Sequence, residues 1–218
     1  MKQPQQRASR RATKRHTQGR FVFRTWGGAR KGAGRKPKGS EPGVSHRRRP
    51  VLGATFPVHV TLRVLPHVWN LRSRRGFTIF SKAVLTAAHR FAMRVCQFSV
   101  QGNHIHLVVE ATHQAALGQG MKGLGVRLAK GLNKLMDRRG RVLADRYHAH
   151  ILRTPSEVRR AVHYVLHNYR KHVVSRGGTL AASYVDPYSS ASCEHGIVLP
   201  RAHTWPLRDL RPDAGEPQ

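Results

Sequence analysis

The feature that most constrains this fold is a pair of alternating segments joined by a two-residue turn. Residues 96–101 alternate between apolar and polar side chains, with Cys96, Phe98 and Val100 as the apolar members. After Gly102-Asn103 the stretch NHIHLVVE, which begins at Asn103, alternates again. Alternation with period two is typical of a strand with one buried face, and Gly-Asn between two such runs favours a hairpin. The sequence therefore predicts a sheet built around these two strands, since an isolated hairpin is barely stable in water.

The segments on either side of the hairpin predict three helices and two more strands. The order is a strand at 58–64, a helix at 78–94, the hairpin, a helix at about 114–139, a strand at 141–152 and a helix at about 155–173. The helices carry apolar residues three or four positions apart, and Thr154-Pro155-Ser156-Glu157 predicts a capping box at the start of the last one. This order predicts an α+β protein with a ferredoxin-like, split βαβ antiparallel sheet and packed helices.

Basic residues are concentrated ahead of this region. The chain holds 40 Lys and Arg against 10 Asp and Glu, a formal net charge of +30, and Glu41 is the one acid among the first 50 residues. So little apolar surface cannot offset the entropy lost on ordering, and residues 1–52 are therefore predicted to form a disordered basic arm. Residues 53–175 are predicted to form the folded domain, and residues 176–218 a loosely ordered tail.

Such a charge calls for a polyanion, and nucleic acid is the predicted partner. Arg47, Arg48 and Arg49 in the arm, with Lys122 and Arg127 on the second predicted helix, are the expected phosphate contacts. No run of about 18 apolar residues and no secretion signal is evident, which argues against a membrane partner and favours the cytoplasm, in association with the nucleoid. A basic RNA-binding module is the alternative interpretation of the charge.

Two histidines lie one residue apart in the second strand of the hairpin. Ile105, Leu107 and Val109 share the core face of this strand, so His104 and His106 project from the other face. Neighbouring imidazoles on one face can bind one divalent cation. The alternative is a pair of surface histidines with no ligand.

A second alternating pair, His148 and His150, competes with the first as the metal site. It lacks the flanking apolar alternation that would hold it rigidly, so an accessory role for His150 near a phosphate, beside Arg146, or simple packing in a strand is the preferred interpretation. Only Cys96 and Cys193 are present, too few for a zinc site built on thiolates. Any metal ion must therefore have nitrogen and oxygen ligands.

The last predicted helix offers a tyrosine on its polar side. Its apolar stripe is formed by Val158, Val162, Val165, Leu166 and Tyr169. Tyr164 points away from the middle of this stripe, one turn from both Arg160 and Asn168. A phenol beside a guanidinium and an amide suits nucleophilic attack on a phosphate, with Asn168 as a third metal ligand and Arg160 as a phosphate contact. Tyr147, in the segment DRYHAHIL, is the competing tyrosine.

Three blocks of the sequence follow one another in order: QGNHIHLVVE, MKGLGVRLAKGLNKLMDRRGRVLADRYHAHIL and SEVRRAVHYVLHNYRKH. Together they resemble the single-tyrosine HUH transposases, in particular the branch associated with repetitive extragenic palindromes (REP), over residues of about 55 to 173. The resemblance implies the HUH nuclease fold, a Mg²⁺ or Mn²⁺ ion, and cleavage of single-stranded DNA near hairpins through a covalent 5′-phosphotyrosine with release of a 3′-OH. Relatives act as monomers or as homodimers that exchange tyrosine helices, and both states are compatible with the sequence.

Residue by residue, the resemblance assigns His104 and His106 as metal ligands, Tyr164 as the nucleophile and Asn168 as the polar residue one turn later. Many relatives have proline after that asparagine, whereas Tyr169 follows it here, so the helix is expected to continue. The predicted function is a metal-dependent transposase or endonuclease that nicks and rejoins single-stranded DNA carrying hairpins or palindromic repeats. The alternative is a domesticated relative that binds such palindromes without cutting them.

Overall fold

The computed structural model of the protein describes residues 51–87, 91–192 and 195–208. The predicted basic arm lies outside these residues except for its last two positions, and so do Arg47, Arg48 and Arg49. Among the described residues, no helix is both long enough and apolar enough to cross a membrane.

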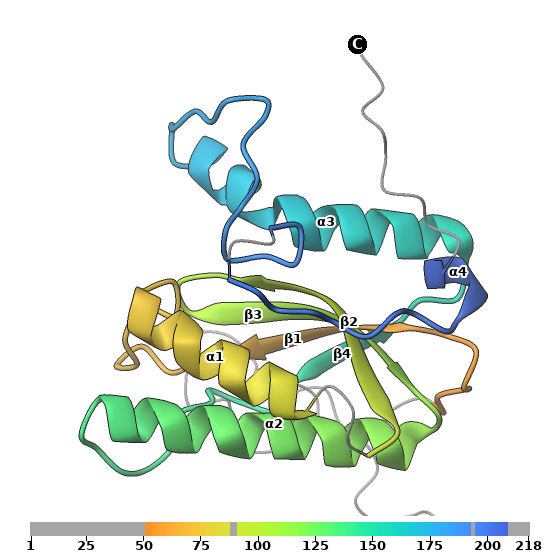
Figure 1. Ribbon diagram of the computed structural model, residues 1–218, viewed down its shortest axis with the longest axis horizontal. Coiled ribbons are helices and arrows are strands. Elements are labelled where there is room, and N and C mark those ends of the chain that lie inside the picture. The colour runs from red at the N-terminus through yellow and green to blue at the C-terminus, as the bar shows by residue number, and fades with distance from the viewer. Residues whose placement is uncertain (1–50, 88–90, 193–194, 209–218) are drawn as a thin grey trace, which may run out of the picture. The chain divides into compact units, whose positions relative to one another are not determined.

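The chain forms a four-stranded antiparallel sheet with helices packed on it (Figure 1). The elements are β1 (Val58–Arg63), α1 (Arg74–Ala87), β2 (Met93–Val100), β3 (His104–Ala111), α2 (Gln114–Leu135), β4 (His148–Ile151), α3 (Pro155–Val174) and α4 (Trp205–Arg208). The strands lie in the order β2-β3-β1-β4, so β3 and β1 are central and β2 and β4 are edge strands. This topology confirms the predicted α+β, split βαβ fold.

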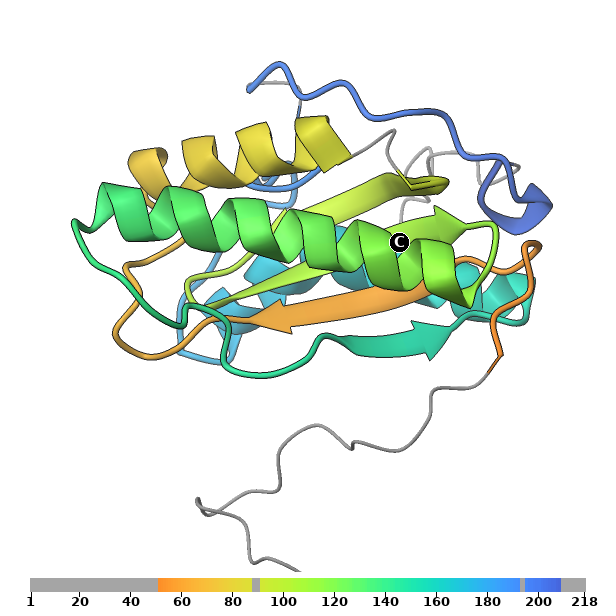
Figure 2. The ribbon, with the colours of Figure 1, turned by 90° about the horizontal axis from the view of Figure 1, so that it is seen from below.

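Helices cover both faces of the sheet. The α1 and α2 helices lie side by side on one face (Figure 2), and α3 covers the other (Figure 1). The alternation of β1 and β3 turns Val60, Leu62, Ile105 and Leu107 toward α1 and α2, where they form the larger core. A smaller cluster that includes Val108, Val158 and Val165 lies beneath α3. The face beneath α3 therefore has room for polar side chains.

The α1 helix is displaced from its predicted position. It begins at Arg74, where the sequence predicts a loop, because the Ser73 hydroxyl accepts a hydrogen bond from the Gly76 N–H and caps the first turn. Its described part ends at Ala87, and the prediction that helix continues to residue 94 is wrong. Phe91 and Ala92 have left-handed backbone angles, φ 63° and 51°, and β2 then begins at Met93.

Two further strand predictions need correction. A bulge in β2 between Val95 and Gln97 reverses the alternation, so Cys96 joins the cluster under α3 instead of the larger core with Phe98. The fourth strand covers only His148–Ile151, although an isolated bridge joins Leu143 to Val64.

The capping box at the start of α3 is confirmed. Thr154 Oγ1 accepts a hydrogen bond from the Glu157 N–H, and the Glu157 carboxylate accepts one from the Thr154 N–H. This box fixes where α3 begins and therefore which of its residues face the sheet.

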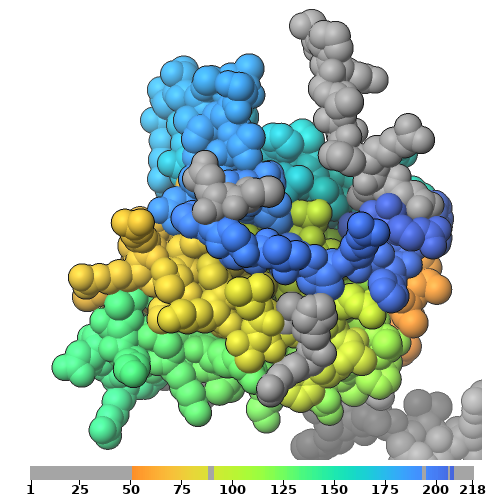
Figure 3. Space-filling view, in the orientation of Figure 1, coloured from red at the N-terminus to blue at the C-terminus, as the bar shows by residue number. Residues whose placement is uncertain are grey.

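The tail after α3 is packed more closely than the sequence suggests. Arg72 forms a bidentate ion pair with Asp186, at 2.9 and 2.8 Å, and the Val100 N–H donates to the Tyr188 carbonyl along the edge of β2. Farther along, the buried Glu110 carboxylate accepts hydrogen bonds from the Thr204 backbone and hydroxyl. Figure 3 shows the described part of this tail, in blue, lying across the molecule between α3 and α1.

Candidate active site

The His104 and His106 side chains lie on the central strand β3 and face α3. His106 is 5% exposed, and His104 is half-buried. The neighbouring strand β1 contributes to the same face, because Thr61 is paired with His106 and Arg63 with His104. The ring centroids of His104 and His106 are 4.9 Å apart. The predicted histidine pair therefore lies beneath α3, with His106 buried and His104 half-buried.

Both imidazoles are held through the Nδ1 atom. Nδ1 of His104 is 2.8 Å from Oδ1 of Asn103. Nδ1 of His106 is 3.2 Å from Oγ1 of Thr61 and 3.2 Å from Nε2 of His59. The rings of His59 and His106 are stacked, with centroids 5.3 Å apart. Nε2 of His106 is buried and has no hydrogen-bond partner among the described residues.

Burial keeps these rings neutral at neutral pH. Loss of hydration, with a smaller contribution from the adjacent His104 and His59, lowers the pKa of His106 to about 3. The pKa of His104 and that of His59 both fall to about 4, again mainly through burial. A neutral imidazole retains one lone pair, which is the form that binds a metal ion.

Three residues of α3 at intervals of four face this histidine pair. The Tyr164 ring lies edge-on to the rings of His106 and His59, with centroid distances of 5.2 and 5.8 Å. Two turns later, the His172 ring lies 5.6 Å from that of His104. Asn168 lies between them on the helix and is 1% exposed, and neither atom of its amide has a hydrogen-bond partner in the described structure. Tyr164 is 37% exposed and so is open to a substrate.

The buried side of α3 differs from the predicted apolar stripe. Its buried residues are Val158, Ala161, Val165 and Asn168. The helix is thus turned so that Asn168 faces the sheet, whereas Val162, Leu166 and Tyr169 are only partly buried. The sheet beneath this part of the helix carries His104, His106, Ser99 and Gln101, which favour a polar partner over leucine. His172 was not predicted, although its spacing of four from Asn168 places it on the same face.

The side chains around the histidine pair differ from the usual metal-binding clusters of proteins. No three His, Cys, Asp or Glu side chains in the described part of the chain form a group that could hold a metal ion. Two histidines with an amide are a different set, and it includes three buried polar atoms without partners, in His106 and Asn168. Mg²⁺ and Mn²⁺ accept amide and water oxygen as ligands. These side chains therefore offer two imidazole nitrogens and one amide oxygen as candidate ligands for a cation.

The structure separates several other predicted site residues from this pair. Lys122 and Arg127 lie on α2, which covers the opposite face of the sheet, and they line a cavity of about 580 Å³ with Phe91. Tyr147 packs against the larger core on that same opposite face, so it cannot serve as the tyrosine of the histidine site. Arg160, in contrast, lies on α3, where it is exposed one turn before Tyr164.

The second histidine pair shares the face of the first. His148 and His150 are exposed on the edge strand β4, and His150 is paired with His59. The exposed Arg146 precedes them, and its backbone N–H donates to the Asp145 carboxylate. The rival pair is thus near the site but outside its buried part.

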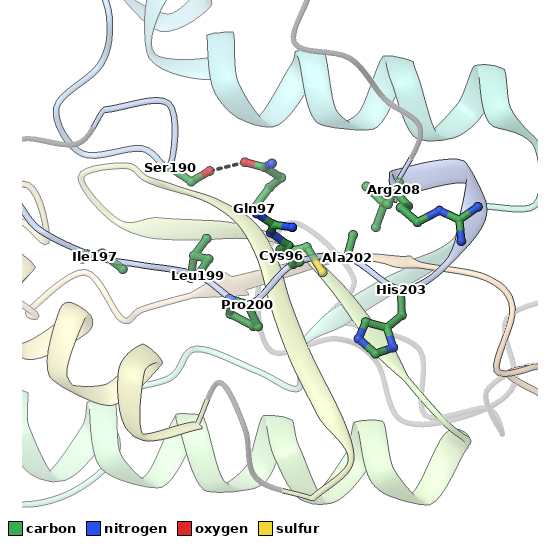
Figure 4. Close-up of a pocket in the computed structure, with 11 residues that line it drawn as sticks. Cys96, Gln97, Ser190, Ile197, Leu199, Pro200, Ala202, His203 and Arg208 are labelled. Carbon is green, nitrogen blue, oxygen red and sulfur yellow. Dashed lines mark hydrogen bonds between the residues drawn. The ribbon is translucent and has the colours of Figure 1, made fainter.

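Two cavities lie near α3. One of about 670 Å³ opens beside His104, with Arg63, His172 and Arg176 in its lining. The other, of about 870 Å³, lies between β2 and the tail, where Ser190 and Gln97 are hydrogen-bonded (Figure 4). Cys96 lines this second cavity, and burial raises the pKa of its thiol to about 12. The second cavity therefore offers no reactive thiolate, and the first is the one that adjoins the histidine pair.

No protein-family model and no curated protein sequence matches the chain. Among solved structures, it is similar to a REP-associated tyrosine transposase bound to a REP hairpin, at 14% identity and a TM-score of 0.53, over 71% of this chain and 88% of that one. A weaker likeness is to a candidate transposase from Deinococcus radiodurans R1, at 10% identity and a TM-score of 0.39, over 62% of this chain and 98% of that one. Another is to a bacterial tRNA(His) guanylyltransferase-like protein in complex with GTP, at 12% identity and a TM-score of 0.41, over 58% of this chain and 68% of that one. The first likeness confirms that this chain has the fold of the REP-associated tyrosine transposase.

Proposed function

We propose that the protein is a Mg²⁺- or Mn²⁺-dependent transposase or endonuclease that nicks and rejoins single-stranded DNA near hairpins through a covalent 5′-phosphotyrosine. The observation that carries the proposal is the position of Tyr164. This partly exposed tyrosine lies against the buried His106 ring. Asn168, on the same helix, is buried against the sheet. Core packing alone does not require a tyrosine, an amide and two histidines to converge on one part of a sheet.

In this proposal His104, His106 and Asn168 hold the cation. The buried Nε2 of His106 and the buried Asn168 amide would gain the partner that they lack among the described residues. A bound divalent ion would supply positive charge to the scissile phosphate and so favour attack by a phenol.

The chain's own residues carry the covalent step. The Tyr164 oxygen attacks phosphorus, the bond from phosphorus to the 3′ oxygen breaks, and the phenolic proton is lost as the 3′ oxygen takes one up. The products are a 5′-phosphotyrosine and a 3′-OH. The Lys171 ammonium, 5.6 Å from the centre of the Tyr164 ring, adds positive charge next to the nucleophile. Attack of a 3′-OH on the phosphotyrosine reverses the step and rejoins DNA without ATP.

The DNA strand is proposed to pass through the cavity beside His104. Arg63 and Arg176 are exposed at this cavity, and neither forms an ion pair among the described residues, so both can contact phosphates. Arg160, one turn before Tyr164 on α3, would contact the DNA backbone on the other side of the scissile bond. Hairpin binding is the expectation for this chain because the REP-associated transposase of the same fold was solved bound to a REP hairpin.

The decisive experiment mixes the full chain with labelled hairpin-bearing single-stranded DNA and Mg²⁺, and separates the products on a denaturing gel. We expect a covalent adduct and a free 3′-OH fragment, both absent with EDTA. Tyr164→Phe should abolish the adduct, and Tyr147→Phe, on the opposite face of the sheet, should retain it. Tight hairpin binding without any nicking over a panel of hairpins would instead favour the non-catalytic, palindrome-binding alternative.

A further inference from the structure

We infer that Asn103, Thr61 and His59 are positioning residues that hold both site imidazoles with the proton on Nδ1, leaving Nε2 of each as the free lone pair. The inference deepens the proposed function and rests on it, because Nε2 is then the atom of each histidine that would bind the cation. The three residues do not touch the DNA or the cation in this scheme. They act through His104 and His106.

For His104 the tautomer follows from the chemistry of its neighbour. Oδ1 of Asn103 is an amide oxygen, which accepts hydrogen bonds and cannot donate them. The 2.8 Å contact with Nδ1 of His104 therefore requires the proton on Nδ1. Nε2 of the same ring must then carry the lone pair. The asparagine that precedes the two histidines in the motif NHIH thus has a role of its own.

For His106 two neighbours on β1 face the same nitrogen. Thr61 and His59 approach Nδ1 at 3.2 Å each, and both can accept a hydrogen bond. If the single proton on Nδ1 is shared between these two acceptors, the buried Nε2 carries a lone pair, which a cation can satisfy. If Nδ1 accepts, Nε2 carries a proton that has no acceptor among the described residues and that blocks metal binding. Only the first arrangement fits a buried ligand.

The stacking of His59 fixes the plane of the His106 ring as well as its proton. The two rings are inclined by 26°, and the His59 ring also lies edge-on to Tyr164. One residue therefore contacts both the proposed ligand and the proposed nucleophile. Outer hydrogen bonds to metal-binding histidines are typically worth about 10- to 100-fold in metal affinity. We expect the larger effect for the half-buried contacts of His106 and the smaller for the exposed Asn103.

The first test needs neither metal nor DNA. In the metal-free full chain, ¹⁵N-histidine NMR distinguishes protonated from unprotonated ring nitrogens. The inference predicts that His104 and His106 are both protonated at Nδ1 and unprotonated at Nε2 at pH 7.5. A proton on Nε2 of His106 would overturn it, whatever the protein does to DNA.

The second test measures Mn²⁺ affinity by calorimetry. Thr61→Val removes the hydroxyl at nearly constant shape and should weaken binding by about 10-fold, and Thr61→Ser should restore it. His59→Phe keeps an aromatic ring against His106 without its nitrogen and should weaken binding to a similar extent, and Asn103→Ala should weaken it less. His148→Gln, on the same face of the edge strand, is the matched control and should bind as the wild type does.

The two tests separate this inference from the proposed function. Wild-type protein that fails to bind Mn²⁺ and to nick DNA would contradict the proposed function, while the NMR result would still decide the tautomers. Wild-type protein that binds and nicks, with Thr61→Val and His59→Phe indistinguishable from His148→Gln in Mn²⁺ affinity, would overturn the positioning roles and leave the function intact.

Discussion

Two histidine pairs with the same spacing lie on the same face of one sheet and have different surroundings. His104 and His106 are on the central strand β3, beneath α3, and His106 is 5% exposed. His148 and His150 are on the edge strand β4 and are exposed. A central strand is enclosed by a neighbour on each side, whereas an edge strand has one neighbour and remains open to water. Position in the sheet, and not the local motif, therefore distinguishes a buried donor pair from a surface pair.

The comparison also shows how burial prepares the first pair. Burial removes the hydration that would stabilise the protonated forms of His104 and His106. Each ring also has a defined hydrogen-bond contact at Nδ1. No hydrogen bond that fixes the His148 or His150 ring is found among the described residues. The predictions that follow test whether this difference, rather than the number of histidines, determines activity.

The largest expected effect is on catalysis. Replacing His104 and His106 with alanine should lower the rate of DNA nicking by about 1,000-fold or more, because a bound cation contributes several kcal/mol to the stabilisation of a phosphoryl transition state. Replacing His148 and His150 should change it by less than about threefold. Initial rates on one hairpin substrate at saturating Mg²⁺ provide the measurement. Equal losses in the two double variants would show that the buried pair has no special role.

A second expected effect is on stability in the presence of metal. If Mn²⁺ binds the folded state and not the unfolded state, a Mn²⁺ concentration of 100 times Kd should raise the free energy of unfolding by about 2.7 kcal/mol. Urea denaturation with Mn²⁺ and with EDTA measures this difference. It should vanish in His106→Gln and persist in His148→Gln. A metal effect that persists in His106→Gln but is lost in His148→Gln would move the site to β4.

How far the sequence could predict this molecule depends on the range of the interactions involved. Alternation and the capping box are local, and they correctly predicted the hairpin and the start of α3. The bulge at Cys96 and the early start of α1 depend on packing and on one serine hydroxyl, which no periodicity reveals. The turn of α3 toward the sheet depends on the polar residues opposite it, so the burial of Asn168 and the place of His172 could not be derived from the helix alone.

The site shows the same limit. The motif NHIH predicted a donor pair, but the partners of Nδ1 on β1 are 45 and 47 residues away along the chain. Only the register that pairs Thr61 with His106 reveals them. Likewise, Lys122 and Arg127 match the charge expected of a DNA contact, but they are on the far face because α2 packs on the other side of the sheet.

The third expected effect is on the pH dependence of stability in the absence of metal. The unfolded chain takes up protons on histidine near pH 6.5, whereas His59 and His104 in the folded chain do so only near pH 4 and His106 near pH 3. Their contribution to stability is therefore fully present above pH 6.5 and is lost as the pH falls toward 4.

Because His59 and His104 are only partly shielded from water, we expect the three histidines together to lose stability on the order of 2 kcal/mol between pH 7 and pH 4.5, less than complete burial would give. Urea denaturation in EDTA across this range measures it. His106→Gln should flatten the dependence, and His148→Gln should leave it close to that of the wild type. A dependence of the same slope in both variants would show that burial of His106 is not its source.

The smallest expected effect is the change in protein stability when the edge pair, His148 and His150, is removed. Removing His148 and His150 together should change the free energy of unfolding at pH 7.5 by no more than about 0.5 kcal/mol, as is usual for exposed side chains away from special contacts. Removing His106 alone leaves the Thr61 hydroxyl and the His59 ring without their shared partner, and the cost should exceed about 1 kcal/mol even without metal. If the edge pair proved as costly as His106, a shared network across β1 would have to join the two pairs. The pairings of His59 with His150 and of Thr61 with His148 give such a network two routes across β1.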